Sequence, residues 1–154
     1  MPARSPPWLE ANPTERDRSR FRVHPDDEAG QRDQTAGVRP RILIVDDHDG
    51  FRAVARAMLE DDGFDVVGEA VDGGSAVMAT EALRPGIVLL DVHLPDSDGF
   101  SVSERLAALS PPPVVVLISS RPLGELRQRV TDSPVAGFIP KHELSGAALI
   151  ALTA

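Results

Sequence analysis

Three aspartates, one serine and the sole lysine of this 154-residue chain are the residues whose types and positions could perform chemistry together. Each stands at the end of a short apolar segment: Asp46, Asp47, Asp91, Ser119 and Lys141. Taken singly, each has a simpler explanation, because aspartate is common at helix starts and turns, serine is mostly structural, and lysine is commonly a solvated charge. Their shared position at segment ends is what favours a joint site.

Three clustered carboxylates repel one another, by roughly 4 kcal/mol for two charges about 4 Å apart at an effective dielectric constant near 20. The cluster therefore needs a cation, or must hold a proton. Mg²⁺ suits it, because this ion binds carboxylates, water and phosphate oxygens, and Mg²⁺ together with Lys141 balances three aspartates. A carboxylate such as Asp91 can attack phosphorus and form an aspartyl phosphate, with the Ser119 hydroxyl as a donor to the transferring group.

The segments before these residues read as buried strands. Continuous runs rich in β-branched residues are typical of parallel strands covered on both faces. Five strands are predicted, at 42–45, 65–69, 87–90, 114–118 and 137–140, and helical periods lie at 51–59, 100–107, 123–130 and 144–152. The fold class is α/β, a doubly wound five-stranded parallel sheet of the flavodoxin-like kind with βα repeated five times. Sites in such sheets lie beyond the carboxyl ends of the strands, where the polar residues are expected to meet.

The first forty residues differ in composition from the rest. Residues 1–40 contain six prolines, and seven basic residues cancel seven acidic ones. They show no apolar period, so we expect a disordered N-terminal extension at 1–40 and one folded domain at 41–154. The extension is a solvated or functional tail, or it lies upstream of a true start near Val38.

Charge and composition exclude several classes of protein. Residues 41–154 carry nine basic and seventeen acidic residues, a net charge of −8, which disfavours direct binding to nucleic acid. The chain has no cysteine, no apolar run long enough for a transmembrane helix, and no secretory signal. We therefore expect a cytoplasmic protein with neither a membrane nor a nucleic acid as a direct partner.

Four motifs in order resemble bacterial two-component response-regulator receiver domains of the stand-alone, chemotaxis-regulator-like kind. They are Ile-Leu-Ile-Val-Asp-Asp-His at 42–48, Leu-Leu-Asp-Val-His-Leu-Pro-Asp-Ser-Asp-Gly at 89–99, Val-Leu-Ile-Ser-Ser at 116–120 and Gly-Phe-Ile-Pro-Lys at 137–141. The resemblance covers residues 41–154, and the separations between the motifs are similar to those of the family. Each motif alone is a weak signal, whereas four at fitting distances are a specific one.

The resemblance implies a role for each matching residue. Asp91 is the implied phosphoacceptor, and Asp46, Asp47 and Asp91 with the backbone carbonyl of His93 are the implied Mg²⁺ ligands, with no other cofactor. His48, directly after the acidic pair, is interpreted as a loop residue.

The later motifs imply the remaining roles. Ser119 matches the hydroxyl residue that contacts the phosphoryl group, with Ser120 as its rival, and Lys141 matches the lysine that pairs with that group. Phe138 matches the aromatic switch position that acts with Ser119, although it lacks the hydroxyl of a tyrosine.

The function that the resemblance implies is a phosphoacceptor switch in two-component or phosphorelay signal transduction. A sensor histidine kinase or phosphotransfer protein would phosphorylate Asp91 with Mg²⁺. A downstream protein would bind the face formed by the fourth helix, fifth strand and fifth helix, and a phosphorylation-dependent homodimer is allowed. We expect no enzyme beyond self-phosphorylation from a phosphodonor and autodephosphorylation, and no DNA-binding effector domain after residue 154.

Two other functions stay open. A receiver-like scaffold could bind partners without phosphate, although such scaffolds usually lack the acceptor or the lysine. A Mg²⁺-dependent phosphatase also forms an aspartyl phosphate, but that class has two aspartates separated by one residue, which neither Asp46-Asp47 nor Asp91-Val92-His93 provides. A phosphohistidine carrier is disfavoured because none of the four histidines lies in a long helical bundle.

Overall fold

Five parallel strands form the centre of the computed structural model, which describes residues 21–23 and 39–154. The order across the sheet is β3-β2-β4-β5-β6. Their bounds are β2 Arg41–Val45, β3 Asp65–Ala70, β4 Ile87–Asp91, β5 Val114–Ser119 and β6 Gly137–Pro140. Strands β2 to β5 are almost wholly buried because helices cover both faces. The predicted doubly wound five-stranded parallel sheet is confirmed.

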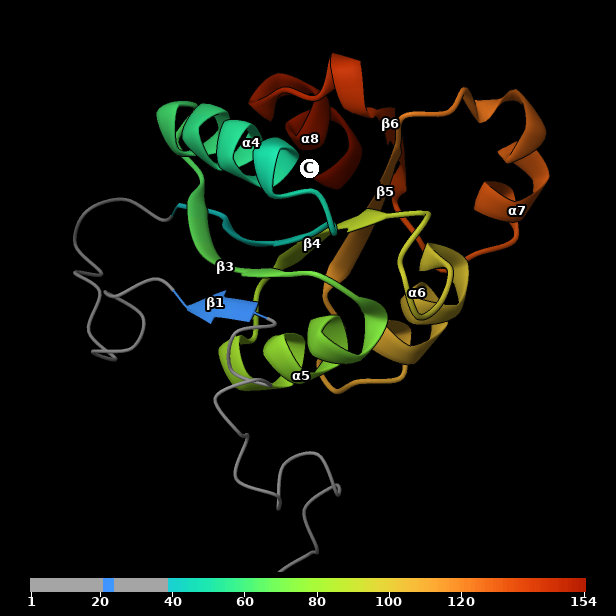
Figure 1. Cartoon of the computed structure of the whole chain (residues 1–154), viewed down its shortest axis with the longest axis horizontal. Helices are drawn as coiled ribbons and strands as arrows, with labels where there is room; N and C mark the ends of the chain where they lie inside the picture. Colours follow the sequence, from blue (N-terminus) through green and yellow to red (C-terminus); the bar gives the residue numbers. More distant parts are fainter. Residues whose placement is uncertain (1–20, 24–38) are drawn as a thin grey trace, which may run out of the picture.

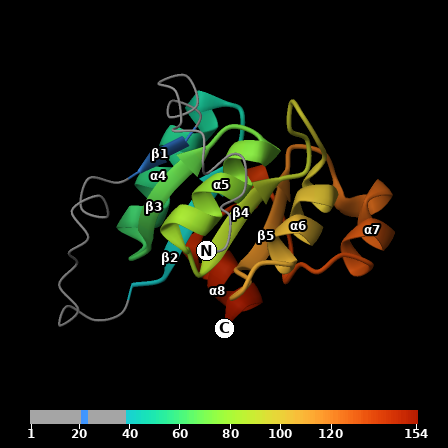
Figure 2. The ribbon, with the colours of Figure 1, turned by 90° about the horizontal axis from the view of Figure 1, so that it is seen from below.

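Helices lie on both faces of the sheet (Figures 1 and 2). On one face are α4 (Asp49–Asp61) and α8 (Gly146–Thr153), and on the other are α5 (Gly73–Leu83) and α6 (Gly99–Ala107). Beside α6 lies the short α7 (Arg127–Thr131), which follows a 3₁₀ turn, η1 (Leu123–Glu125); a second, η2 (Lys141–Glu143), precedes α8. Among the described residues, no helix is both long and apolar enough to cross a membrane.

The chain changes direction between β2 and β4, and this change positions the site. These two strands are neighbours, yet β2 leads into α4 on one face whereas β4 leads into α6 on the other. The loops after the two strands therefore separate and leave space between them at the carboxyl edge of the sheet. Asp46 follows β2 and Asp91 ends β4, so both residues lie at this point.

A sixth strand lies at the edge of the sheet, and the sequence analysis did not predict it. Strand β1 (Phe21–Val23) pairs antiparallel with β3, with Phe21 opposite Ala70 and Val23 opposite Gly68. The sequence analysis expected these three residues to belong to a disordered extension, and the pairing with β3 corrects that expectation for them. Without β1, β3 would present an open edge with unpaired backbone groups. Residues 1–20 and 24–38 of that extension lie outside the described part of the chain.

Two helices differ in detail from the predicted patterns. The helical period expected at 51–59 spans Val54, an apolar residue that the structure leaves 68% exposed. The inward side of α4 is centred on Arg52, Ala55 and Leu59, and a rotation of about 100° per residue turns Val54 away from it. No period was found for α5 because its small residues are buried on several sides rather than along one stripe.

Substitution of Gly99, the first residue of α6, tests how closely this helix packs on the end of β4. A Cβ atom on Gly99 would lie 2.6 Å from the backbone oxygen of Asp91 and 2.9 Å from Cα of Val92. We expect Gly99→Ala to lower the free energy of unfolding by about 1–3 kcal/mol in urea titration, because backbone must move. Gly50→Ala near the start of α4, where a Cβ meets nothing within 4 Å, is the matched control and should be neutral or stabilising. Equal stability of the two variants would contradict the close packing.

Candidate functional site

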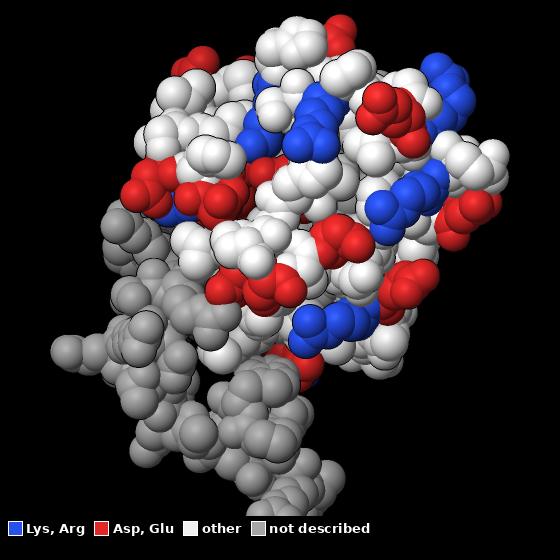
Figure 3. All heavy atoms as spheres, turned by 45° about the vertical axis from the view of Figure 1, so that its right-hand side comes forward, with Lys and Arg blue, Asp and Glu red and all other residues white. Residues whose placement is uncertain are grey.

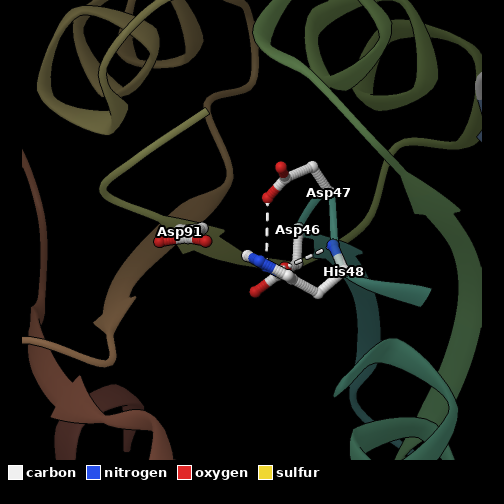
Figure 4. Close-up of side chains that lie close together, drawn as sticks. All are labelled: Asp46, Asp47, His48 and Asp91. Atoms are coloured by element: carbon white, nitrogen blue, oxygen red, sulfur yellow. Dashed lines mark hydrogen bonds and ion pairs between the residues drawn. The ribbon is translucent and has the colours of Figure 1, made fainter. Parts of the chain in front are cut away.

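Two buried carboxylates lie at the carboxyl ends of neighbouring strands. The β2–β4 register pairs Val45 with Leu90, so the next residues, Asp46 and Asp91, are adjacent. Asp46 is 0% exposed and Asp91 is 3% exposed. Asp47 comes from the same loop as Asp46 (Figure 4), and its side chain is 35% exposed.

Lys141 lies between the two buried carboxylates. Its Nζ is 2.6 Å from Oδ2 of Asp46 and 3.1 Å from Oδ2 of Asp91, and its side chain is 14% exposed. The same ammonium group lies 4.7 Å from the centre of the Phe51 ring, which adds a favourable cation–π contact. Burial alone would lower the pKa of Lys141, but the ion pairs with Asp46 and Asp91 outweigh it and raise the pKa, so the ammonium group stays charged.

Among residues 21–23 and 39–154, the carboxylates of the site outnumber the lysine that contacts them. Burial raises the pKa of Asp91, and the neighbouring Asp46 charge adds to this, while the backbone N–H of His93 and the Lys141 ammonium oppose it. Oδ2 of Asp46 is buried without an aligned hydrogen bond, although Lys141 approaches it as an ion pair. Asp46, Asp47 and Asp91 against Lys141 leave a surplus of negative charge, which is the electrostatic condition for a divalent cation.

His48 contacts both members of the acidic pair, which the sequence analysis did not foresee. Its backbone N–H donates to Oδ1 of Asp46 at 2.8 Å. Its Nδ1 lies 3.0 Å from Oδ1 of Asp46 and 3.1 Å from Oδ1 of Asp47 (Figure 4). Ligand atoms of Asp46, Asp47, His48 and Asp91 all lie within 4.8 Å of one another. The only sequence signal was that a histidine directly follows the two aspartates.

The remaining predicted residues, His93 and Ser119, lie in the loop after β4 and at the end of the neighbouring strand β5. The backbone N–H of His93 donates to Oδ1 of Asp91 at 3.1 Å, which puts the His93 peptide beside the carboxylate. Ser119 is fully buried at the end of β5, and its Oγ accepts a hydrogen bond from the Arg121 N–H at 3.0 Å. Its hydroxyl hydrogen is thus free to donate elsewhere. Ser120 is exposed, in keeping with the choice of Ser119 over its neighbour.

The folded part of the chain matches a known family. The profile of the response regulator receiver domain matches residues 42–152 of this chain. The chain belongs to the response regulator receiver domain family. The signal receiver domain of the response regulator NarL from Mycobacterium tuberculosis is a similar solved structure, with a TM-score of 0.67, 30% identity, and coverage of 75% of this chain and 98% of that one.

Longer proteins contain similar receiver domains. The virulence-factor transcription regulator BvgA of Bordetella pertussis is 35% identical over 103 residues, which are 67% of this chain and 49% of BvgA. The transcriptional regulatory protein PdtaR of Mycobacterium tuberculosis is 32% identical over 122 residues, 73% of this chain and 60% of PdtaR. The chain thus spans about half to three fifths of the length of these two relatives.

A buried arginine fixes the loop of the acidic pair in this receiver domain. Arg52 on α4 donates to the backbone oxygen of Asp46 at 2.6 Å and to Oε1 of Glu69 on β3 at 3.0 Å, and it also contacts Asp49. Arg56, one turn later, donates to the other Glu69 oxygen at 2.9 Å. Buried charges require such partners. The sequence signal was a polar residue at an inward position of α4, and the sequence analysis passed over it.

An aspartate in the loop after β4 fixes the other side of the site. Oδ1 and Oδ2 of Asp96 accept hydrogen bonds from the backbone N–H groups of Gly73 and Gly74, at 2.8 and 3.0 Å, at the start of α5. Partial burial opposes ionisation, but these hydrogen bonds outweigh it and lower the pKa of Asp96. The loop that follows Asp91 is thereby held against α5.

The structure thus brings Asp46, Asp47, Asp91 and Lys141 together, as predicted from their positions at strand ends. Ser119 ends the neighbouring strand β5 and the His93 peptide lies in the loop after β4. Their phosphoryl and metal roles stay predictions. Phe138 lies apart on β6, half-buried against the apolar cluster that also includes Leu126 and Val130. That position is compatible with a switch and equally with a core residue.

The pKa of Asp91 leads to a prediction about stability. A raised pKa means that the native state binds this proton more tightly than the unfolded chain does, so stability is lost as the pH rises from the ordinary value of 3.8 through the raised pKa. In EDTA at neutral pH, Asp91→Asn should be more stable than wild type, and in acid below pH 3.8 the gain should vanish. Urea unfolding at both pH values measures this.

The exposed Asp61→Asn variant is the control, since it makes the same exchange outside the site. A neutral-pH loss of stability in Asp91→Asn, with Asp61→Asn unchanged, would mean that the ion pair with Lys141 outweighs the burial of the charge.

Proposed function

We propose that this receiver domain is a phosphoacceptor switch in two-component or phosphorelay signalling, with Asp91 as the acceptor and Mg²⁺ as the metal. The observation that carries the proposal is the environment of Asp91. It is a buried carboxylate at the end of the central strand, with Oδ2 on the Lys141 ammonium and Oδ1 on the His93 N–H. Such fixed donors around one carboxylate are suited to a reaction in which negative charge moves onto a transferred group.

The residues around Asp91 have complementary parts in phosphoryl transfer. A carboxylate oxygen of Asp91 forms a new bond to phosphorus while the bond between phosphorus and the donor breaks, and the electron pair leaves with the donor. Lys141 is placed to balance the charge on the phosphoryl oxygens. Ser119 ends β5, the strand next to β4, and its hydroxyl can donate to one of these oxygens.

The acidic residues fit a divalent cation. Asp46, Asp47 and Asp91, with the backbone carbonyl of His93, are the groups that we assign to Mg²⁺, in keeping with the surplus of negative charge and with the preference of the ion for oxygen ligands. When bound, the ion supplies charge stabilisation to the phosphoryl oxygens. A hydrogen bond from the His48 backbone N–H orients the Asp46 carboxylate, and Arg52 fixes the Asp46 backbone.

The proposed partners follow from the signalling role. A sensor histidine kinase or a phosphotransfer protein donates the phosphoryl group. Beyond accepting this group and hydrolysing its own aspartyl phosphate, the domain catalyses no reaction. On the face drawn in Figure 3, basic side chains stand apart among acidic ones rather than forming a continuous patch, which supports the absence of direct nucleic-acid binding. The transcriptional roles in the names of BvgA and PdtaR are properties of those longer proteins.

The face formed by α7, β6 and α8 is the proposed output surface. Helix α7 has no buried residue. Its contacts with α6 include Arg129, which lies 4.1 Å from the Phe100 ring centre and 3.4 Å from Asp98. Segments with few buried contacts are the ones that rearrange at low free-energy cost. A phosphorylation-dependent homodimer through this face is one form of output.

Phosphorylation of Asp91 is tested with acetyl phosphate and Mg²⁺. We expect the wild-type chain to gain the mass of one phosphoryl group, with the modified peptide containing Asp91, and Asp91→Asn to lose the gain. Asp61→Asn, whose carboxylate is exposed at the end of α4, is the control and should label like wild type. Labelling of Asp91→Asn at the wild-type rate would refute the assignment.

The role of Ser119 is tested by measuring how far the conformational change spreads from Asp91. A phosphoryl group on Asp91 presents new acceptor oxygens, and movement of Ser119 toward one would free space beside Phe138, whose burial is favourable by roughly 1.5–3 kcal/mol. That range shifts a two-state population by an order of magnitude or more. With beryllofluoride as the phosphate mimic, wild-type amide chemical shifts should change over 123–132 and 137–149, whereas in Ser119→Ala they should change only near Asp91.

Ser120→Ala is the matched control, because Ser120 is the exposed neighbour of Ser119. It should transmit the change like wild type. If Ser119→Ala also transmits it fully, the route through Ser119 is wrong.

A further inference from the structure

Strand β1 lies along the carboxyl end of β3 (Figure 1). Its three residues pair with the last three residues of β3, and its central residue, Arg22, lies opposite Glu69. Strands β2 and β3 are parallel, and Val45 pairs with Ala70, so this end of β3 lies beside Asp46. A segment from before the folded domain thus reaches the edge of the sheet at which the acidic pair is held.

Both backbone groups of Asp46 depend on that end of β3. The Asp46 N–H donates to the carbonyl oxygen of Ala70 at 3.0 Å. The Asp46 carbonyl oxygen accepts from Arg52 at 2.6 Å, and the Glu69 carboxylate holds Arg52 at 3.0 Å. Glu69 is 7% and Arg52 6% exposed, and a buried charge is costly to leave without its partner. A displacement of Glu69 is therefore transmitted through Arg52 to the Asp46 loop.

The direction of the backbone connects β1 to Glu69. In a strand with neighbours on both sides, the backbone groups of successive residues face opposite neighbours. The Ala70 carbonyl faces β2, so the Glu69 backbone faces β1, and we expect Arg22 and Glu69 to be the hydrogen-bonded pair of this ladder. Three residues make a short strand, and so short a pairing opens at low free-energy cost. Strand β1 can thus leave while the parallel sheet stays intact.

We propose that the edge of β3 at residues 68–70 is a docking surface for an extended peptide segment, and that residues 21–23 of this chain are its occupant. Their docking holds the Asp46 loop in the geometry that phosphorylation of Asp91 requires. Strand edges bind extended segments through backbone hydrogen bonds. A segment of the same chain is favoured over a second copy because its tether gives it a high effective concentration.

The inference rests on the proposed function in one respect, that Asp91 accepts the phosphoryl group. It adds to that function control by a segment that precedes the folded domain. Whatever captures residues 21–23, or competes with them for the edge of β3, would change the rate at which Asp91 is labelled.

The test compares two substitutions of one residue in the full chain. Arg22→Pro removes the backbone N–H that faces β3, whereas the matched control Arg22→Ala removes the same side chain and keeps the N–H. In Arg22→Pro, the Asp46 amide should exchange hydrogen faster by roughly ten-fold or more, with the amides of Leu89 on β4 and Val116 on β5 unchanged. Labelling of Asp91 by acetyl phosphate and Mg²⁺ should slow by roughly three-fold or more. Arg22→Ala should behave like wild type in both measurements.

A peptide separates docking from a general loss of stability. A synthetic peptide of residues 17–27, added to Arg22→Pro at millimolar concentration, matches the effective concentration of a tethered segment. It should restore both the slow exchange of the Asp46 amide and the labelling rate, because it supplies the missing strand. If it restores neither, the edge of β3 is not a docking surface and the proposal is overturned.

Three other results of Arg22→Pro also overturn it. Wild-type exchange of the Asp46 amide would show that β1 does not hold this loop. Faster exchange of all amides together, or loss of the fold, would show that β1 stabilises the whole domain. A dimer in light scattering with unchanged Asp46 exchange would make the edge of β3 an interface between copies. Absence of labelling in wild type removes the proposed function instead, and the exchange of the Asp46 amide still decides whether β1 holds the loop.

Discussion

Lys141 Nζ lies 2.6 Å from Asp46 Oδ2 and 3.1 Å from Asp91 Oδ2, and the arrangement of the site depends on this contact. Two carboxylates taken out of water on adjacent strands would otherwise repel each other with nothing in between. One ammonium group offsets part of that repulsion, but three carboxylates still exceed it. Lys141 thus allows the two buried carboxylates to lie side by side in the folded chain. The remaining negative charge still favours the binding of one more cation.

The loops on both sides of this contact are fastened by side chains outside it. Arg52 ties the backbone of Asp46 to Glu69 on β3, and Asp96 ties the loop after Asp91 to the start of α5. In both cases the interaction is a hydrogen bond to a buried or partly buried charged group. Because hydrogen bonds are directional, they fix the position of a loop more narrowly than apolar contacts do. The carboxylates are thus positioned from two different faces of the sheet, and each loop can be fixed without closing the space between them.

Stability is unevenly distributed, and this distribution suits a switch. Strands β2, β4 and β5 are buried on both faces, and Asp91, the proposed acceptor, lies at the end of the central one. In contrast, α7 has no buried residue. A charge added at Asp91 would therefore leave the centre of the sheet unchanged and displace the elements that are least costly to move.

The five-stranded parallel sheet and the gathering of Asp46, Asp47, Asp91 and Lys141 could be predicted from the sequence, because continuous apolar runs mark buried strands and parallel strands end on one edge. Three features could be seen only in the folded chain: the oxygens that Lys141 contacts, the contact of His48 with Asp46 and Asp47, and the inward position of Arg52 rather than Val54 on α4. The pairing of residues 21–23 with β3 is another such feature. The physical reason is that periodicity and chain order are local properties, whereas side-chain direction and pairing across an edge depend on partners distant in the chain.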